Sequence, residues 1–376
     1  MKHSYLMTPG PSPLLPEVKA ALGRDIIHHR TDEFREVLKE AHEGLKYLFQ
    51  TKNPVLIFSS SGTGAMEAAV SNFLKKEDKA LIVMGGKFGE RWKEICESFG
   101  VETVPLNVEW GNAPISEDIE KLLDADSGIK AVYTTLCETS TATVYDIKSI
   151  AEVIRKKGLL CVVDAVSGLG QDVLKTDEWG VDVVVSGSQK GLMLPPGLAF
   201  LSFSKKAEKF LEESDLPKYY FDLKKASKSW EKNDTPFTPS VSLIFALRES
   251  LRVIREEGLE TRWKDFGKMG RALRSALTSL GFEILSKSPS SSVTAALVKE
   301  IDTASIVRKM RKEYGISIAG GQGHLKGKIV RIAHMGYINP SDIVMCLSVL
   351  EKVLADSGVS IEKGVSLKAF QEVYYA

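Results

Sequence analysis

The chain has 376 residues, of which 43% are hydrophobic and 26% are charged. This length suits about two packed domains, or one large α/β domain with an appendage. The 50 Lys and Arg residues against 49 Asp and Glu residues leave a formal charge of +1. Bulk electrostatics therefore indicate neither a nucleic acid nor a membrane surface as a partner, so a ligand has to be inferred from a local site.

The start of the chain, from Met1 to Pro11, has no apolar stretch of signal-peptide length, and no later run is long enough to cross a bilayer. We therefore expect a cytoplasmic protein. The cysteines lack the C-x-x-C spacing, and the six histidines lack metal-ligand spacing, so we predict neither a disulfide framework nor a metal site. The four cysteines are Cys96, Cys137, Cys161 and Cys346.

In chain order, the first expected element is a helix that Thr31 caps and that ends near Gln50, with one apolar stripe. From about residue 53, short β-branched runs alternate with amphipathic segments such as 116–123 and 147–157. This pattern is typical of strands joined by crossover helices in a mainly parallel sheet. The seven expected strands are 55–58, 80–84, 101–106, 130–135, 159–164, 181–186 and 198–203.

A long helical stretch, 241–280 with a break near Gly258, is expected to bridge two domains. The remainder predicts a small α+β domain. Its expected strands lie near 282–285, 294–298 and 329–333, and its helices near 303–314 and 340–356. We expect a large domain over 16–255 and a small domain made of 1–15 and 256–376.

The first candidate site is the glycine-rich turn at Ser61, Gly62 and Thr63, which follows the strand 55–58 and opens a helix that ends near Leu74. A helix N-terminus offers unpaired N–H groups and the positive end of the dipole, so this turn can hold a phosphate. The alternative is a simple strand-to-helix turn, because the run matches neither a Walker loop nor the dinucleotide fingerprint.

Two further candidate residues lie at or just after the end of an apolar strand. Asp164 ends the strand 159–164, where ligands bind in doubly wound sheets; its alternative role is to cap the next turn. Lys190 follows the strand 181–186 and has small or uncharged neighbours. Burial lowers the pKa of an amine and makes it nucleophilic, as Schiff-base chemistry requires, although a surface lysine with a buried stem is the alternative.

Together these features meet the needs of pyridoxal 5'-phosphate (PLP) chemistry. That chemistry needs a phosphate anchor, a carboxylate that keeps the pyridine nitrogen protonated, and a lysine that forms a Schiff base with the aldehyde. The three features occur in the order Gly62, Asp164 and Lys190, each at the expected carboxyl end of a strand.

At this point the chain resembles the class V aminotransferases of PLP fold type I, and among them the serine-pyruvate and alanine-glyoxylate group. The resemblance spans nearly the whole chain. It rests on six motifs in order, namely Thr-Pro-Gly-Pro at 8–11, Ser-Gly-Thr at 61–63, Glu-Thr-Ser-Thr at 138–141, Asp-Ala-Val at 164–166, Ser-Gln-Lys at 188–190 and Val-Arg-Ile-Ala-His-Met-Gly at 330–336.

The resemblance implies a role for each matching residue. It implies that the turn at 61–63 and Gln189 hold the cofactor phosphate, and that Phe88 stacks on the pyridine ring. It implies that Thr139 bonds near the ring hydroxyl, that Asp164 pairs with the ring nitrogen, and that Val166 packs on the opposite ring face. Thr238 matches a threonine that reaches the phosphate from the neighbouring subunit, which implies a homodimer with active sites at its interface.

The substrate side rests on two residues. Arg331 matches an arginine that binds the substrate α-carboxylate, and Gly10 would add a backbone contact to the same group. The alternative for Arg331 is a cross-strand ion pair. Alanine, serine and aspartate are all compatible donors, but no second arginine clearly matches a distal-carboxylate partner, which favours a small donor. Glyoxylate and pyruvate are the expected acceptors.

The expected reaction is a ping-pong transamination in which the freed amine of Lys190 moves the α-proton. Two alternatives stay open. One is a PLP-dependent lyase or cysteine desulfurase of the same fold, for which Cys137 is the one cysteine near the expected site. The other is a phosphate- or nucleotide-binding α/β protein without PLP, which would leave Lys190 and Arg331 unexplained.

Overall fold

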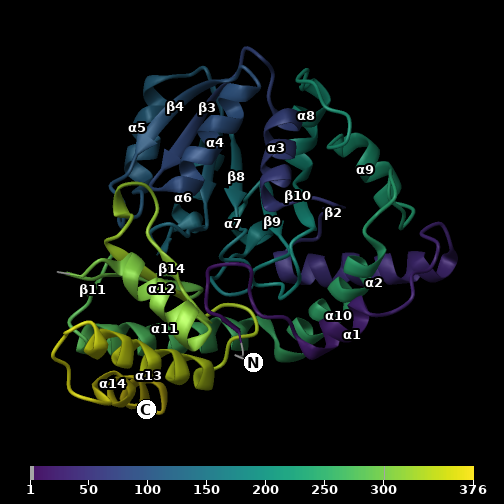
Figure 1. Cartoon of the computed structure of the whole chain (residues 1–376). Coiled ribbons are helices and arrows are strands. Elements are labelled where there is room, and N and C mark those ends of the chain that lie inside the picture. The colour runs from purple at the N-terminus through teal and green to yellow at the C-terminus, as the bar shows by residue number, and fades with distance from the viewer. Residues whose placement is uncertain (1–3, 300) are drawn as a thin grey trace.

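A computed structural model describes residues 4–299 and 301–376 of the chain. Figure 1 shows a twisted sheet with helices on both faces, and below it a smaller, helix-rich part that contains the C-terminus. The architecture expected from the sequence, a mainly parallel sheet with a smaller α+β part, is confirmed.

The central sheet has seven strands in the order β2-β10-β9-β8-β5-β3-β4. All seven expected strands are present, with ends that differ from the prediction by at most two residues. Strand β10 is antiparallel to both β2 and β9, whereas the other neighbours in the sheet are parallel. The strands are β2 (Val55–Phe58), β3 (Lys79–Met84), β4 (Glu102–Asn107), β5 (Ile129–Thr135), β8 (Leu160–Asp164), β9 (Val183–Gly187) and β10 (Ala199–Phe203).

Each face of the sheet is covered by its own layer of helices, because the strands are apolar on both sides. In β8, for example, Cys161 and Val163 pack into one core while Leu160 and Val162 pack into the other. The first core holds α1 (Pro16–Leu22), α2 (Asp32–Phe49), α5 (Ser116–Ala125), α6 (Ile147–Lys156), α7 (Thr176–Trp179) and α10 (Val241–Glu257). The second holds α3 (Gly62–Phe73), α4 (Lys87–Ser98), α8 (Lys205–Glu213) and α9 (Leu223–Trp230).

The expected break in the long helical stretch falls at Gly258, whose φ of +78° is a backbone conformation that favours glycine. It separates α10 from α11, which enters the smaller part. There a four-stranded sheet has the order β11-β12-β15-β14. The elements are α11 (Leu259–Ser279), β11 (Glu283–Ile284), β12 (Val293–Leu297), α12 (Thr303–Tyr314), β13 (Ile316–Ser317), β14 (Ala319–Gly320), η1 (Gly323–Leu325), β15 (Ile329–Ala333), α13 (Pro340–Asp356) and α14 (Val365–Tyr374).

Two short segments tie the large and small parts together. Strand β1 (Tyr5–Leu6) runs parallel to β13. The hairpin of β6 (Cys137–Glu138) and β7 (Thr143–Val144) is bonded to the segment before β12, with Val144 N donating to Ser288 O at 2.9 Å and Ser290 N donating to Ala142 O at 3.0 Å. Residues 1–3 of the expected N-terminal arm lie outside the described residues, and the domain boundaries at 15 and 255 stay a prediction.

In the part of the chain that the structure describes, every helix is too short or too polar to cross a membrane.

Candidate active site

Lys190 lies on the loop that joins β9 to β10. The two ends of this loop are bonded to each other: Ser188 N donates to Leu198 O at 2.9 Å, and Leu198 N donates to Ser188 Oγ at 3.1 Å. From the N-terminal arm, Ser12 N donates to Gln189 O at 3.0 Å and Ser12 Oγ donates to Lys190 O at 2.8 Å. The backbone of the lysine is therefore fixed from both sides.

The amine of Lys190 is buried, with only 6% of the residue exposed. Its Nζ donates to Thr139 Oγ1 at 3.4 Å and also to Ser167 Oγ, and the two hydroxyls bond to each other. The same nitrogen lies 5.2 Å from the centroid of the Phe88 ring. Burial lowers the pKa of Lys190 to about 8, while Asp164 acts in the opposite direction. An appreciable fraction of this amine is therefore neutral, and hence nucleophilic, near neutral pH.

Asp164 ends β8 and is also buried. Its Oδ1 accepts a hydrogen bond of 2.7 Å from Val166 N. Burial raises the pKa of Asp164 to about 6, opposed by that hydrogen bond and by the charge of Lys190. A buried carboxylate of this kind is well suited to a protonated ring nitrogen, because such a partner stabilises its ionised form.

The turn at Ser61, Gly62 and Thr63 brings the N-terminus of α3 against the end of β8. No side chain caps this helix end, and although Gly64 N donates to Ser61 O at 2.9 Å, the N–H groups of Gly62 and Thr63 can still donate to an anion. The approach is close, since a Cβ on Gly62 would lie 2.8 Å from Cγ2 of Val166. On the other side, a Cβ on Gly187 would lie 3.3 Å from Gly62 N. Glycine is therefore required where β8, β9 and α3 meet.

Phe88 stands in the first turn of α4, and Glu138 holds that turn in place. The carboxylate of Glu138 is fully buried and accepts hydrogen bonds of 3.1 Å from the N–H groups of both Phe88 and Gly89. It also accepts from Ser140 N at 3.1 Å and from Ser140 Oγ at 2.5 Å. A negative group at a helix N-terminus is stabilised by the helix dipole. The aromatic ring is thereby oriented toward Lys190.

Arg331 lies on β15, and 7% of it is exposed. Its Nε donates to Gly320 O at 2.9 Å and its Nη1 donates to Thr139 O at 2.9 Å. Within residues 4–299 and 301–376 it forms no salt bridge, so the expected alternative of a cross-strand ion pair is wrong for the described residues. Burial lowers the pKa of Arg331 to about 10. Thr139 therefore contacts both residues, Arg331 through its carbonyl oxygen and the Lys190 amine through its hydroxyl.

Gly10 lies against the Lys190 side chain, since a Cβ there would be 3.0 Å from Cγ of the lysine, and its φ of +97° is left-handed. Gln189 precedes the lysine, and its Oε1 is buried without a hydrogen-bond partner among the described residues. Thr238 is exposed on the loop before α10, and no contact is recorded between it and Lys190. Of the predicted site residues, it is the one that this single chain leaves outside the group.

Three residues at the site were not assigned roles from the sequence. Ser167 bonds to the Lys190 amine, and its position directly after the Asp-Ala-Val motif was the available signal. Glu138 opens the Glu-Thr-Ser-Thr motif, but its capping of a distant helix cannot be read from spacing. Arg91 donates to Thr63 Oγ1 at 3.4 Å and lies 4.9 Å from the Phe88 ring centroid.

The comparisons with known proteins agree with this geometry. Residues 12–341 match the model of the class V aminotransferases. The chain belongs to the class V aminotransferase family. Among its relatives, the L-aspartate–glyoxylate aminotransferase of Paracoccus denitrificans is 35% identical, with 98% of this chain and 96% of the relative covered. The small subunit of a soluble hydrogenase from Synechococcus sp. is 42% identical, with 94% of each chain covered.

A solved structure extends the likeness to three dimensions. The ureidoglycine–glyoxylate aminotransferase of Bacillus subtilis superposes with a TM-score of 0.96 at 31% identity, covering 100% of this chain and 99% of the other. This class V aminotransferase is accordingly a transaminase, and the resemblance inferred from the six motifs is confirmed. The lyase and the nucleotide-binding alternatives have weaker support.

Proposed function

We propose that this transaminase binds pyridoxal 5'-phosphate through Lys190 and transfers the amino group of a small L-amino acid to a 2-oxo acid such as glyoxylate or pyruvate. The observation that carries the proposal is the buried amine of Lys190, with a pKa of about 8, beside the buried carboxyl of Asp164. Relatives named for aspartate–glyoxylate and ureidoglycine–glyoxylate transfer support the choice of acceptor.

The groups present match the chemistry of the cofactor. The uncapped N-terminus of α3 offers N–H donors for the phosphate, and Gln189 lies nearby as a further side chain for it. Asp164 suits the ring nitrogen, Thr139 suits the ring hydroxyl, and the face of Phe88 suits the ring itself. When bound, the cofactor supplies an electron sink for the bond that breaks at the substrate α-carbon.

The residues of the chain have separate tasks in the transfer. Arg331 binds the substrate α-carboxylate, to which a planar guanidinium can donate two parallel hydrogen bonds. The Nζ of Lys190 takes the α-proton in its neutral form and returns a proton in its charged form, which a pKa of about 8 allows near neutral pH. The hydroxyls of Thr139 and Ser167 orient that nitrogen, and Gly10 leaves the lysine side chain room.

The amino donor is proposed to be alanine or serine, with aspartate as a further candidate. Arg331 can bind the α-carboxylate common to all three. The hydrogenase name of a relative is not carried over, because the groups around Lys190 fit amino-group transfer.

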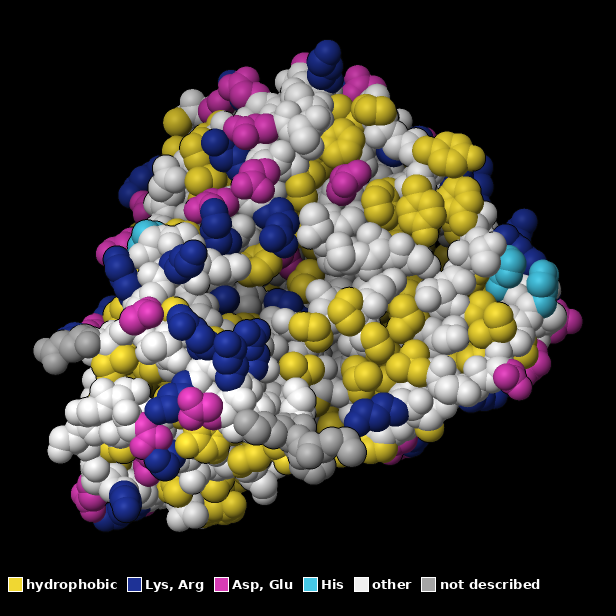
Figure 2. Space-filling view, in the orientation of Figure 1, with side chains coloured by type: hydrophobic (Ala, Val, Ile, Leu, Met, Phe, Trp, Pro, Cys, Tyr) yellow, Lys and Arg dark blue, Asp and Glu magenta, His cyan; other side chains and the backbone are white. Residues whose placement is uncertain are grey.

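We further propose a homodimer in which Thr238 reaches the site of the neighbouring subunit. The loop that carries Thr238 lies next to exposed aromatic side chains, namely Tyr219, which is 72% exposed, and Tyr220, which is 39% exposed. Figure 2 shows apolar side chains gathered on the right of this face, in the region of α9 and β2. Such a patch favours a protein partner over solvent.

Borohydride reduction of the holoprotein followed by peptide mapping tests the role of Lys190. We expect the label on Lys190, and we expect Lys190→Ala to abolish turnover while the cofactor still binds non-covalently. Lys218→Ala is the matched control, because Lys218 is a partly buried lysine whose pKa burial also lowers, and it bonds to Ser71 O. Label on another lysine, or near-normal transamination by Lys190→Ala, would refute the proposal.

A desulfurase requires a reactive cysteine. Cys137 is buried, its Sγ lies 3.6 Å from Ser292 Oγ, and burial raises the pKa of its thiol to about 12. Little thiolate is therefore present at neutral pH. Measuring sulfide release from cysteine alongside amino-group transfer separates the two activities, and only the second is expected.

A further inference from the structure

A second cavity lies outside the group around Lys190. It has a volume of about 350 Å³ and is bounded by α11, by the loop that joins β15 to α13, and by the end of α14. The lining side chains used below are Arg262, Asp265, Phe266, Met269, Tyr337 and Tyr374. None of its lining residues belongs to the active site predicted from the sequence.

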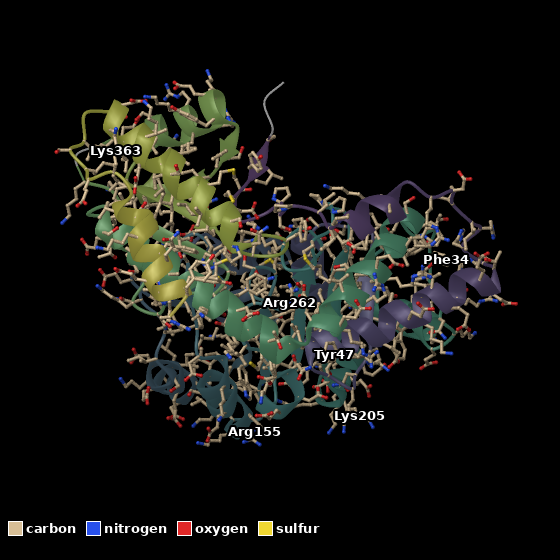
Figure 3. All side chains as sticks on the ribbon, turned by 90° about the horizontal axis from the view of Figure 1, so that it is seen from below. Phe34, Tyr47, Arg155, Lys205, Arg262 and Lys363 are labelled. Carbon is tan, nitrogen blue, oxygen red and sulfur yellow. The ribbon has the colours of Figure 1, made fainter. Side chains whose placement is uncertain are left out.

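Arg262 is the unusual residue of this cavity. Its side chain is only 3% exposed, and Nη1 pairs with Glu257, whose side chain is 46% exposed. The guanidinium carbon lies 5.1 Å from the centroid of the Phe266 ring. Figure 3 shows Arg262 on α11 between the helices of the small part and the α2 and α10 helices, with Tyr47 on the neighbouring α2.

Most of the donors of Arg262 are unused. Nε and Nη2 are buried and have no hydrogen-bond partner among the described residues. A guanidinium carries five N–H donors, and buried donors in folded proteins are nearly always paired. Nε and one Nη form the edge of the guanidinium that binds a carboxylate through two parallel bonds. Because Arg262 lines the cavity, a carboxylate that enters it and displaces the side chains covering this edge would pair both donors.

The other residues that line the cavity restrict the chemistry of the ligand further. Asp265 is exposed at the cavity, and Glu257 lines it as well, so a ligand with a carboxylate alone would meet two negative charges. An ammonium group on the same ligand would be attracted to them. Phe266 and Met269 are buried apolar residues, and Tyr337 is 45% exposed. They provide a surface for an apolar body.

We propose that this cavity binds a zwitterionic amino acid with an apolar side chain, its carboxylate on Arg262 and its ammonium on Asp265. The volume of the cavity is at the lower end of the range for small-molecule sites, which suits a ligand of this size. The proposal goes beyond the transaminase activity and does not depend on it.

The wall of the cavity is continuous with the turn that holds Lys190. Gly336 lines the cavity and has a φ of +68°. A Cβ at this position would lie 3.0 Å from Ser12 Oγ and 3.1 Å from Lys190 O. A ligand that shifts the loop after β15 would therefore act on the backbone of the active-site lysine.

The test is calorimetric binding of L-phenylalanine to the Arg331→Leu protein, in which the carboxylate anchor of the active site is removed. We expect saturable binding, and we expect Arg262→Met in the same background to weaken it at least about ten-fold, as for loss of a charge-assisted hydrogen bond. Lys264→Met is the control, because Lys264 is an exposed neighbour on α11 and is not part of the lining; it should leave binding unchanged.

A second, exposed substitution guards against a folding defect in the Arg262 variant. Asp265→Asn should weaken L-phenylalanine binding while leaving the binding of 3-phenylpropanoate, which has no ammonium group, unchanged or stronger. The proposal would be overturned if the Arg331→Leu protein did not bind L-phenylalanine. It would also be overturned if the Arg331→Leu protein and the Arg331→Leu, Arg262→Met double variant bound L-phenylalanine equally well. Because the readout needs neither cofactor nor turnover, its failure is distinct from failure of the proposed transaminase function.

Discussion

Replacing Lys190 with Met should stabilise the apoprotein at neutral pH. Burial lowers the pKa of this lysine from an ordinary 10.5 to about 8. One pKa unit corresponds to about 1.4 kcal/mol. Below pH 8, where the buried amine is charged, it therefore lowers the free energy of unfolding by about 3 kcal/mol. Met fills a similar volume without a charge, so the Lys190→Met apoprotein should be more stable by up to about 3 kcal/mol at pH 7.

The sign of the pH dependence follows from proton binding. Between pH 8 and 10.5 the unfolded chain keeps the Lys190 proton and the folded chain has lost it, so the stability of the wild type rises with pH in this window. The advantage of Lys190→Met should therefore shrink between pH 8 and 10.5. Urea unfolding of both apoproteins at pH 7, 8, 9 and 10 measures it. If the difference in unfolding free energy between the two apoproteins stayed constant with pH, the pKa of Lys190 would not be lowered in the folded state, and the reasoning would be refuted.

Three further substitutions test other parts of the site. Glu138→Ala should lower the unfolding free energy by about 3–5 kcal/mol, because it leaves three N–H donors unpaired, two of them buried. Glu138→Gln should lower it less, and urea unfolding compares the two variants. Arg331→Lys should raise KM for donor and acceptor about ten- to hundred-fold through loss of two-bond recognition, in steady-state kinetics. Gly62→Ala should weaken binding of the cofactor to the apoprotein at least about ten-fold in an absorbance titration, because its Cβ would meet Val166 at 2.8 Å. Gly23→Ala, whose Cβ would make only ordinary contacts, should bind it normally.

The sequence predicted the sheet well because most of its strands, the edge strand β4 excepted, are buried on both faces and are therefore largely apolar. Short elements with weaker patterns escaped prediction. The β6–β7 hairpin has only two residues in each strand, and α14 follows a polar loop near the C-terminus. Their position depends on contacts with distant segments, such as the bond from Val144 N to Ser288 O, which no local pattern encodes.

The site residues likewise divide into those that a local pattern predicts and those that depend on distant contacts. The placement of Asp164 and Lys190 at one edge of the sheet could be predicted because each ends an apolar strand or follows one directly, and parallel strands end at a common edge. Glu138 could not, because its partners are the backbone N–H groups of residues about fifty positions earlier. A capping contact across that distance depends on how α4 packs on the sheet. The roles assigned to Lys190, Asp164, the turn at 61–63 and the other site residues, Thr238 included, stay predictions until a bound cofactor and a dimer are observed.

The reversed direction of β10 makes the position of Lys190 depend on packing inside the sheet. Since β9 and β10 are antiparallel neighbours, residues 188–198 alone connect them, and Gly187 pairs directly with Ala199. A one-residue slip of β10 would exchange the environments of Phe200 and Leu201, which pack into opposite cores. The length of the lysine loop is therefore set by side chains that never meet a substrate, and attempts to redesign this loop should begin with the register of the strand behind it.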